Sequence, residues 1–353
     1  MKLSDYTIAL LEDIEKRIDC DTEDDFHSQW RSFWSGEFNE VIFAPKRRKT
    51  TMPSLEVRQI NINDALSDLE LMLDHQLAKV SHALSVETYA PCVRANYGTG
   101  IMTSLFGAEI FVMPREMDTL PTTRSYNDSE PVRRILERGI PDLCSGFGQN
   151  VFGFGELARE VFSNYPKIEK YVTVFHPDTQ GPLDVCELLW GSEMFYEMYD
   201  DPDFVHDVMT LISETFTAFL EKWYKIIPKK NGLNVHWSWV HPGPIMLRND
   251  SAMNLSPELY REFALKYDKR LLEHFSGGCV HFCGRGDHYI DMLLSLDCVT
   301  CINFSQPHLN NMDVIFDSIV RNNKKFLAYP RQACLEYAKR PDAIKGYIHI
   351  SED

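Results

Sequence analysis

From about residue 87 onward, the sequence contains eight short apolar runs separated by stretches of helical character. Each run is rich in β-branched or aromatic residues and ends close to a Gly, Pro, His or Asp, as strands followed by turns do. They are TYAPCVRA, AEIFVM, YVTVFHP, LNVHWSWV, GCVHFCG, VTCINFS, KFLAYP and GYIHIS. Eight strands alternating with helices predict a (β/α)8 TIM barrel, a fold whose active sites lie at the C-terminal ends of the strands.

Residues 1–86 have a different pattern, which predicts a helical extension packed on the barrel. Apolar residues three and four apart form one stripe over residues 3–35 and another over about 62–85, as amphipathic helices require. We therefore divide the chain into an extension, 1–86, and a barrel, 87–353. The eighth predicted strand ends at Ser351, two residues before Asp353, so we expect the N-terminal helices to cover the place of the eighth barrel helix.

Charge and composition narrow the classes of function. The formal net charge is −16, which disfavours binding to nucleic acid or to an anionic membrane, because both rely on Lys and Arg meeting phosphate. Acidic residues interrupt the apolar positions of the first 25 residues, so we expect no export signal. The nine cysteines favour reduced thiols. A cytoplasmic protein is the expectation.

The stretch GGCVHFCG, residues 277–284, places an imidazole and a thiol two residues apart. Side chains alternate along a strand, so His281 and Cys283 face one way while Val280 and Phe282 face the other. Val and Phe suit the helix layer, which leaves His281 and Cys283 inside the barrel mouth. A catalytic zinc needs two such ligands, a third from elsewhere and one open position. The alternative is a buried thiol beside a hydrogen-bonded histidine.

Three longer runs of the sequence carry a family resemblance. They are DTQGPLDVCELLWGSEMFYEMYDDPDFVHDVM, DSAMNLSPELYREFALKYDKRLL and VHFCGRGDHYIDMLLSLDCVTCINFSQP. Together they resemble the uroporphyrinogen decarboxylase superfamily. The resemblance covers roughly residues 87–350 and implies a TIM barrel. It is closer to the branch of zinc-dependent methyltransferases, which move a methyl group from a corrinoid protein to a thiol, because the R-Q-A-G-R-Y motif of the decarboxylase branch is missing. In the methyltransferase branch a His-x-Cys motif provides two zinc ligands, and His281 and Cys283 match that motif here.

The third zinc ligand departs from the family pattern. The methyltransferases place a Cys at the end of the last strand, where this chain reads GYIHIS. We expect His349 to replace it, because His can take the place of Cys on zinc. Cys334 and Cys301 are the alternatives.

Other polar side chains gather at predicted strand ends. The resemblance implies that Asp178 and Gln180 face the substrate, although Asp178 could instead cap a helix. We expect Arg285 to help orient the substrate and His236 to act as an acid, a base or a substrate contact. His176 and His241 are the expected cofactor contacts.

The leading hypothesis is therefore a zinc methyltransferase acting between a corrinoid, carried by a partner protein, and a small thiol. A metal-free decarboxylase of uroporphyrinogen or a smaller acid is the second hypothesis, and a barrel that binds a corrinoid without catalysis is the third. The oligomeric state stays open, with a homodimer as one option.

Overall fold

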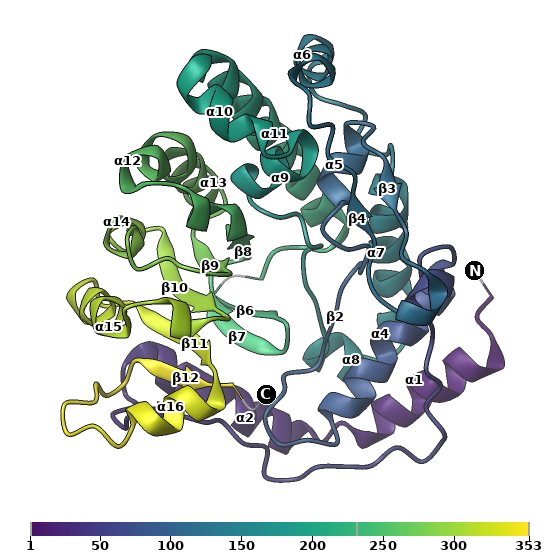
Figure 1. Ribbon diagram of the computed structural model, residues 1–353. Helices are drawn as coiled ribbons and strands as arrows, with labels where there is room; N and C mark the ends of the chain where they lie inside the picture. The colour runs from purple at the N-terminus through teal and green to yellow at the C-terminus, as the bar shows by residue number, and fades with distance from the viewer. Residues whose placement is uncertain (1, 231, 352–353) are drawn as a thin grey trace.

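A parallel sheet of six strands, in the order β1-β12-β11-β10-β9-β8, forms the centre of the computed structural model, which describes residues 2–230 and 232–351. Helices lie outside this sheet and follow it round in an arc (Figure 1). The six strands are β1 (Ile42–Phe43), β8 (Ile245–Arg248), β9 (Gly278–Phe282), β10 (Val299–Phe304), β11 (Lys325–Tyr329) and β12 (Ile348–Ile350).

Six further strands form pairs outside this sheet. β2 (Cys92–Val93) pairs in parallel with β5 (Thr173–Val174), and two antiparallel hairpins are formed by β3 (Ile110–Phe111) with β4 (Thr122–Thr123) and by β6 (Leu233–His236) with β7 (Trp239–Pro242). Alternating strands and helices with a parallel sheet are compatible with a TIM barrel. Within the described residues, however, the strand pairing does not join β2 and β5 to the larger sheet, so it does not show a closed barrel.

The helices include the amphipathic segments expected from the sequence. The predicted N-terminal helix is divided at Ile18–Asp19, and Asp19 caps the second part through the backbone N–H of Thr22. In chain order the helices are α1 (Asp5–Arg17), α2 (Cys20–Ser35), α3 (Ile62–Ala65), α4 (Leu69–Ala83), α5 (Ile101–Leu105), α6 (Ser129–Arg138), α7 (Gly148–Phe162), α8 (Pro166–Tyr171), α9 (Pro182–Trp190), α10 (Glu193–Asp200), α11 (Pro202–Ile226), α12 (Pro257–Tyr260), α13 (Lys266–His274), α14 (Ile290–Leu294), α15 (Met312–Arg321) and α16 (Arg331–Tyr337). No helix in the described part of the chain is both long and apolar enough to cross a bilayer.

Two of the eight predicted barrel strands are wrong. AEIFVM contributes β3 to an antiparallel hairpin outside the main sheet. LNVHWSWV is a hairpin in which His236 pairs with Trp239. Trp237 and Ser238 form its two-residue turn, with φ angles of 46° and 67°, the left-handed region that tight hairpin turns need. The strand that pairs with β9 here is β8, which the sequence analysis missed.

Side chains of the main sheet alternate between two environments. Val280, Phe282 and Ile302 belong to the large core formed with the helices, whereas Cys279 and Cys301 belong to a smaller core on the inner side. The inner core also contains Val235 and Val240 of the β6–β7 hairpin, which lies toward the middle of the molecule (Figure 1). The predicted inward direction of His281 follows from this alternation and is confirmed.

The N-terminal segment contributes to the sheet as well as covering it. β1 pairs in parallel with β12, so that Ile42 lies beside Ile348. Behind this edge, Trp30 of α2 packs against Phe43 at 5.0 Å and against His349 at 4.6 Å between ring centroids. The edge left by the last strand is therefore closed by an N-terminal strand and an N-terminal helix.

We predict that Trp30→Ala lowers the free energy of unfolding by about 3–5 kcal/mol, because the indole is fully buried and its removal leaves a cavity. Denaturant unfolding measures the change. The control is Tyr199→Ala, which removes a ring that is 73% exposed and is expected to change the free energy by less than about 0.5 kcal/mol. Equal stability of the two variants would contradict the packing of α2 on the inner core.

Candidate metal centre and its surroundings

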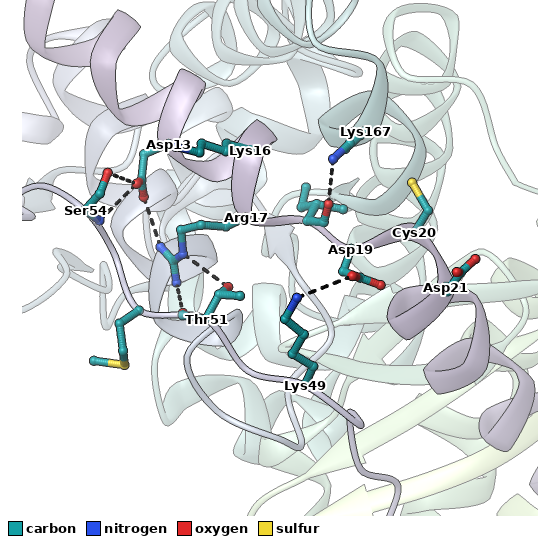
Figure 2. Close-up of a pocket in the computed structure, with 12 residues that line it drawn as sticks. Asp13, Lys16, Arg17, Asp19, Cys20, Asp21, Lys49, Thr51, Ser54 and Lys167 are labelled. Carbon is teal, nitrogen blue, oxygen red and sulfur yellow. Dashed lines mark hydrogen bonds and ion pairs between the residues drawn. The ribbon is translucent and has the colours of Figure 1, made fainter.

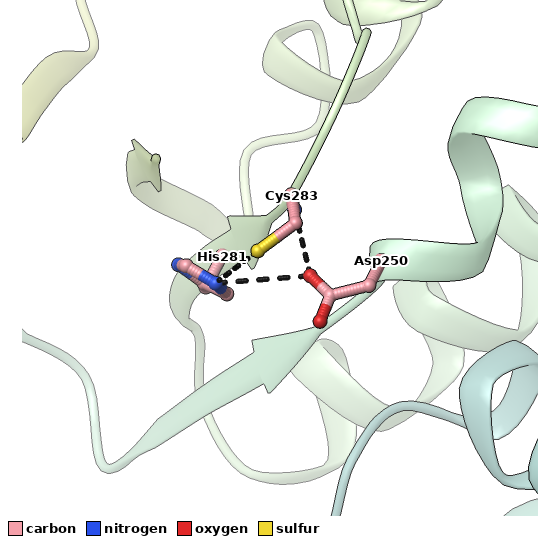
Figure 3. Close-up of side chains that lie close together, drawn as sticks. All are labelled: Asp250, His281 and Cys283. Atoms are coloured by element: carbon pink, nitrogen blue, oxygen red, sulfur yellow. Dashed lines mark hydrogen bonds and ion pairs between the residues drawn. The ribbon is translucent and has the colours of Figure 1, made fainter. Parts of the chain in front are cut away.

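Asp250, His281 and Cys283 bring three potential metal ligands together at the C-terminal ends of β8 and β9. Their ligand atoms all lie within 4.8 Å of one another, and the three side chains point toward a common space (Figure 3). Nε2 of His281 lies 3.5 Å from Sγ of Cys283 and 3.7 Å from Oδ1 of Asp250. Among the described residues, no other set of three or more His, Cys, Asp or Glu side chains meets this criterion.

A second residue fixes the proton on His281. Nδ1 of His281 lies 2.5 Å from Oδ1 of Asn303, whose own amide group donates to the carbonyl of Leu327 at 2.8 Å. Because this carbonyl can only accept, the Asn303 oxygen faces His281 and Nδ1 carries the proton. Nε2 is then left with a lone pair directed at Cys283 and Asp250. Metal-binding histidines are oriented in this way by hydrogen bonds to their other nitrogen.

The donor set fits a zinc ion. Tetrahedral zinc with bonds of about 2.0–2.3 Å separates its ligand atoms by about 3.2–3.8 Å, and the distances of 3.5 and 3.7 Å from Nε2 of His281 fall in that interval. Burial, followed by the nearby Asp250 carboxylate, raises the pKa of the Cys283 thiol to about 11. Burial also lowers the pKa of His281. A bound cation stabilises the thiolate, which opposes the raised pKa of Cys283. It also stabilises the neutral imidazole, which agrees with the lowered pKa of His281.

Sequence reasoning missed Asp250 because it missed β8. Asp250 follows β8 by two residues, and its Oδ1 accepts a hydrogen bond from the backbone N–H of Cys283 at 2.6 Å. Asp184 of α9 accepts from the backbone N–H groups of Asp250 and Ser251 at 3.0 and 2.8 Å. The sequence does contain a sign of this strand end, because the apolar run PIMLR is followed by the polar pair Asn249-Asp250.

The structure does not bring His349, the predicted third ligand, into this group. His349 is buried against Trp30 and Phe43, and its Nδ1 accepts from the backbone N–H of Ala328 at 2.9 Å. The two alternatives also lie elsewhere: Cys301 is in the inner core and Cys334 is in the core shared with the helices. Asp250, and not a residue of the last strand, is therefore the third candidate ligand.

Asp178 and Gln180 lie in the interior, beside two arginines. Oδ2 of Asp178 pairs with Nη1 of Arg94 at 2.7 Å, and Oδ1 pairs with Nε of Arg248. Gln180 donates to Asp178 at 3.4 Å and has a φ of 57°. Burial alone would raise the pKa of Asp178, but Arg248 and Arg94 together hold it below the usual range. The helix cap considered for Asp178 is not formed, because α9 has no side-chain cap.

Arg248 also connects this ion pair to the metal candidate. Its guanidinium lies over the ring of Trp237 at 4.5 Å, and that ring packs edge-on against His281 at 5.0 Å between centroids. Arg285, by contrast, has a 60% exposed side chain and pairs with Asp287 at 2.7 Å. The structure therefore brings Asp178 and Gln180 near the metal candidate and places Arg285 at the surface.

His176, His236 and His241 form a separate buried group. Nδ1 of His236 lies 2.6 Å from Nε2 of His241, and the His176 and His236 rings are 4.4 Å apart between centroids. Met246 of β8 donates its backbone N–H to Nε2 of His176 at 3.0 Å. These three residues thus contact one another rather than the three candidate ligands.

A cleft of about 500 Å³ opens on Asp250. Its lining contains the carboxylates of Asp184, Glu187 and Asp250, the amides of Gln180 and Asn127, and no Lys, Arg or His among the described residues. A larger cleft, of about 590 Å³, lies between α1, α2 and α8 (Figure 2). Its charged groups are largely paired with one another, as Asp13 is with Arg17 and Asp19 with Lys49. Of these two clefts, the one of about 500 Å³ contains a candidate metal ligand, Asp250.

The fold is similar to that of a solved methyltransferase from Methanosarcina mazei. The two structures superpose with a TM-score of 0.62 at 13% sequence identity, over 93% of this chain and 92% of the other. No family model matches the sequence. No curated protein matches it either. At this identity the likeness establishes a shared fold.

We predict that Asp178→Asn lowers the free energy of unfolding at pH 7 by about 3–5 kcal/mol, because it leaves two arginines without their buried counter-charge. The folded pKa of Asp178 is depressed, so its contribution is complete above an unfolded pKa of about 3.9 and is lost as the pH falls through the folded value. The difference between wild type and variant should therefore shrink below about pH 4.

Denaturant unfolding between pH 7 and pH 3 measures this difference. Asp313→Asn is the matched control, since it removes one partner of an ion pair whose aspartate side chain is 68% exposed. A pH-independent difference for Asp178→Asn would contradict the depressed pKa.

Proposed function

We propose that this protein is a zinc-dependent methyltransferase that moves a methyl group between a corrinoid, carried by a partner protein, and a small thiol. The observation that carries the proposal is the convergence of His281, Cys283 and Asp250 at strand ends. The shared fold with a methyltransferase supports it, as does the resemblance of the sequence to zinc methyltransferases of the uroporphyrinogen decarboxylase superfamily. The proposal assumes that the strands form a closed (β/α)8 barrel.

His281, Cys283 and Asp250 would hold the zinc ion. Three protein ligands leave one position for a substrate, the arrangement of catalytic rather than structural zinc. When bound, zinc lowers the pKa of a coordinated thiol, so that the thiol reacts as thiolate near neutral pH. Asn303 keeps the proton of His281 on Nδ1 and so keeps Nε2 available.

The remaining interior residues orient and shield the substrate. Asp184 fixes the backbone of Asp250 and Ser251 at the entrance. The ring of Trp237 packs edge-on against His281 and so supports the orientation of its imidazole. Gln180 lines the cleft that leads to Asp250, and its side-chain amide is oriented by donating to Asp178.

Two other functions have less support. A decarboxylase acting on a tetrapyrrole with several carboxylates would need basic groups in its cleft, whereas the cleft beside Asp250 is lined by acidic and uncharged side chains. A barrel that binds a corrinoid without catalysis would not need three zinc ligands with an open position. Conversion of uroporphyrinogen to coproporphyrinogen by the purified protein would reverse this ranking.

We predict that the purified protein contains about one zinc per chain. Cys283→Ser and Asp250→Ala should each lose most of it, because each removes one of three donors. Cys334→Ser and His349→Gln are the matched controls and should keep it, since both residues lie outside the group. Elemental analysis measures the content. Full zinc content in Cys283→Ser would refute the ligand assignment.

We further predict that the zinc-loaded protein transfers the methyl group of methylcobalamin to a thiol. The thiolate attacks the methyl carbon, and the electron pair of the broken C–Co bond stays on cobalt, so the visible absorption of the corrinoid changes under anaerobic conditions. Cysteamine and 2-mercaptoethanol should outperform 2-mercaptoethanesulfonate once thiol pKa is allowed for, because the cleft is acidic. No transfer to any of these thiols by fully zinc-loaded protein would contradict the proposal.

A further inference from the structure

A narrow cavity of about 180 Å³ lies at the opposite ends of the strands from the candidate metal centre. Its lining includes Thr173 at the start of β5, Pro244 just before β8 and the C-terminal end of α11, together with His176 after β5 and His236 at the end of β6. It occupies the place where the described strand pairing does not join β5 to β8. His176 spans this place through its hydrogen bond with Met246.

His236 lines this cavity, and among the described residues one of its buried ring nitrogens has no hydrogen-bond partner. The carbonyl of Pro242 can only accept, so Nδ1 of His241 carries a proton and donates to it at 3.0 Å. Nε2 of His241 is then a lone pair, which accepts from Nδ1 of His236 at 2.6 Å. Nε2 of His236 is consequently a lone pair as well, and the described residues provide no donor to it.

The neighbouring His176 cannot donate a hydrogen bond to Nε2 of His236. His176 uses Nε2 to accept from Met246, so its proton is on Nδ1, which donates to the carbonyl of Pro177 at 2.7 Å. His236 is 1% exposed, and burial, followed by the neighbouring histidines, lowers its pKa. It therefore stays neutral, and an unpaired buried acceptor of this kind costs about 1–3 kcal/mol until a donor reaches it.

The outer end of the cavity is basic. Arg159, Lys229 and Lys230 line the rim, with Glu169 as the one acidic lining residue among those described. Lys230 is solvent-exposed at the rim, yet enough protein surrounds its ammonium group that burial lowers its pKa. The ammonium group donates a hydrogen bond to the neutral hydroxyl of Thr173 at 3.3 Å. The walls between rim and His236 are mostly apolar, with Phe162, Val174 and other aromatic or aliphatic side chains.

We propose that this cavity binds a small amphipathic anion that places a hydroxyl or N–H group against Nε2 of His236 and a carboxylate beside Lys230. An aromatic or short alkyl body fits the apolar walls. The volume is below the roughly 300–1,000 Å³ of pockets for drug-sized ligands, so the ligand is a metabolite-sized molecule. This site is separate from the proposed methyl transfer and does not depend on it.

Isothermal titration of the full chain tests this with 4-hydroxybenzoate, 4-hydroxyphenylacetate and 3-(4-hydroxyphenyl)propanoate, which differ in length. At least one should bind. For that one, the matched compound without the hydroxyl and the matched phenol without the carboxylate should each bind about tenfold more weakly, the usual size of one such hydrogen bond or ion contact in a desolvated site.

Variants assign the two ends. Lys230→Met should remove the advantage of the carboxylate and leave that of the hydroxyl, whereas His236→Leu should do the reverse. Lys345→Met, at an exposed position elsewhere, is the control and should bind like wild type. Because Lys230 is at the rim, its variant keeps the test valid even if His236→Leu does not fold. Absence of binding by all three compounds, or equal affinity of wild type and Lys230→Met, would overturn the proposal.

Discussion

The two-sided environment of the parallel sheet determines where chemistry can occur in this protein. Along β9, Val280 and Phe282 are fixed in the core with the helices, and this forces His281 to the inner side. The same alternation places Asn303 of β10 beside His281. A shift of one residue in register would exchange the two faces and bury the imidazole among helices. The donor group therefore depends on hydrophobic packing several ångströms away.

Charge is distributed in layers through the interior. The donor group carries carboxylate and thiol, the next layer pairs Asp178 with Arg94 and Arg248, and the third contains neutral histidines. Trp237 separates the first layer from the others by contacting both His281 and Arg248. Most of the buried charged groups are therefore paired with an opposite charge, because an unpaired buried charge is costly.

Much of the fold could be predicted from the sequence because β9 to β12 are apolar runs with clear ends. The hairpin was not recognised because the residues of its turn, Trp237 and Ser238, are not the Asn or Gly that usually mark left-handed positions. β8 was missed because it lies just after this ring-rich stretch. That one omission hid Asp250, so reasoning about the third ligand turned to the last strand, where His349 in fact packs on aromatic rings.

The pairing of β1 with β12 has a consequence for how the chain folds. Ile42 and Ile348 are neighbours in the sheet but lie about 300 residues apart in the sequence, so β1 can pair only after β12 has been synthesised. Contacts of such long sequence separation form late and slowly. Until then Trp30 of α2 lacks its contact with His349 of β12, so the N-terminal helix and strand gain their final packing in the same late step.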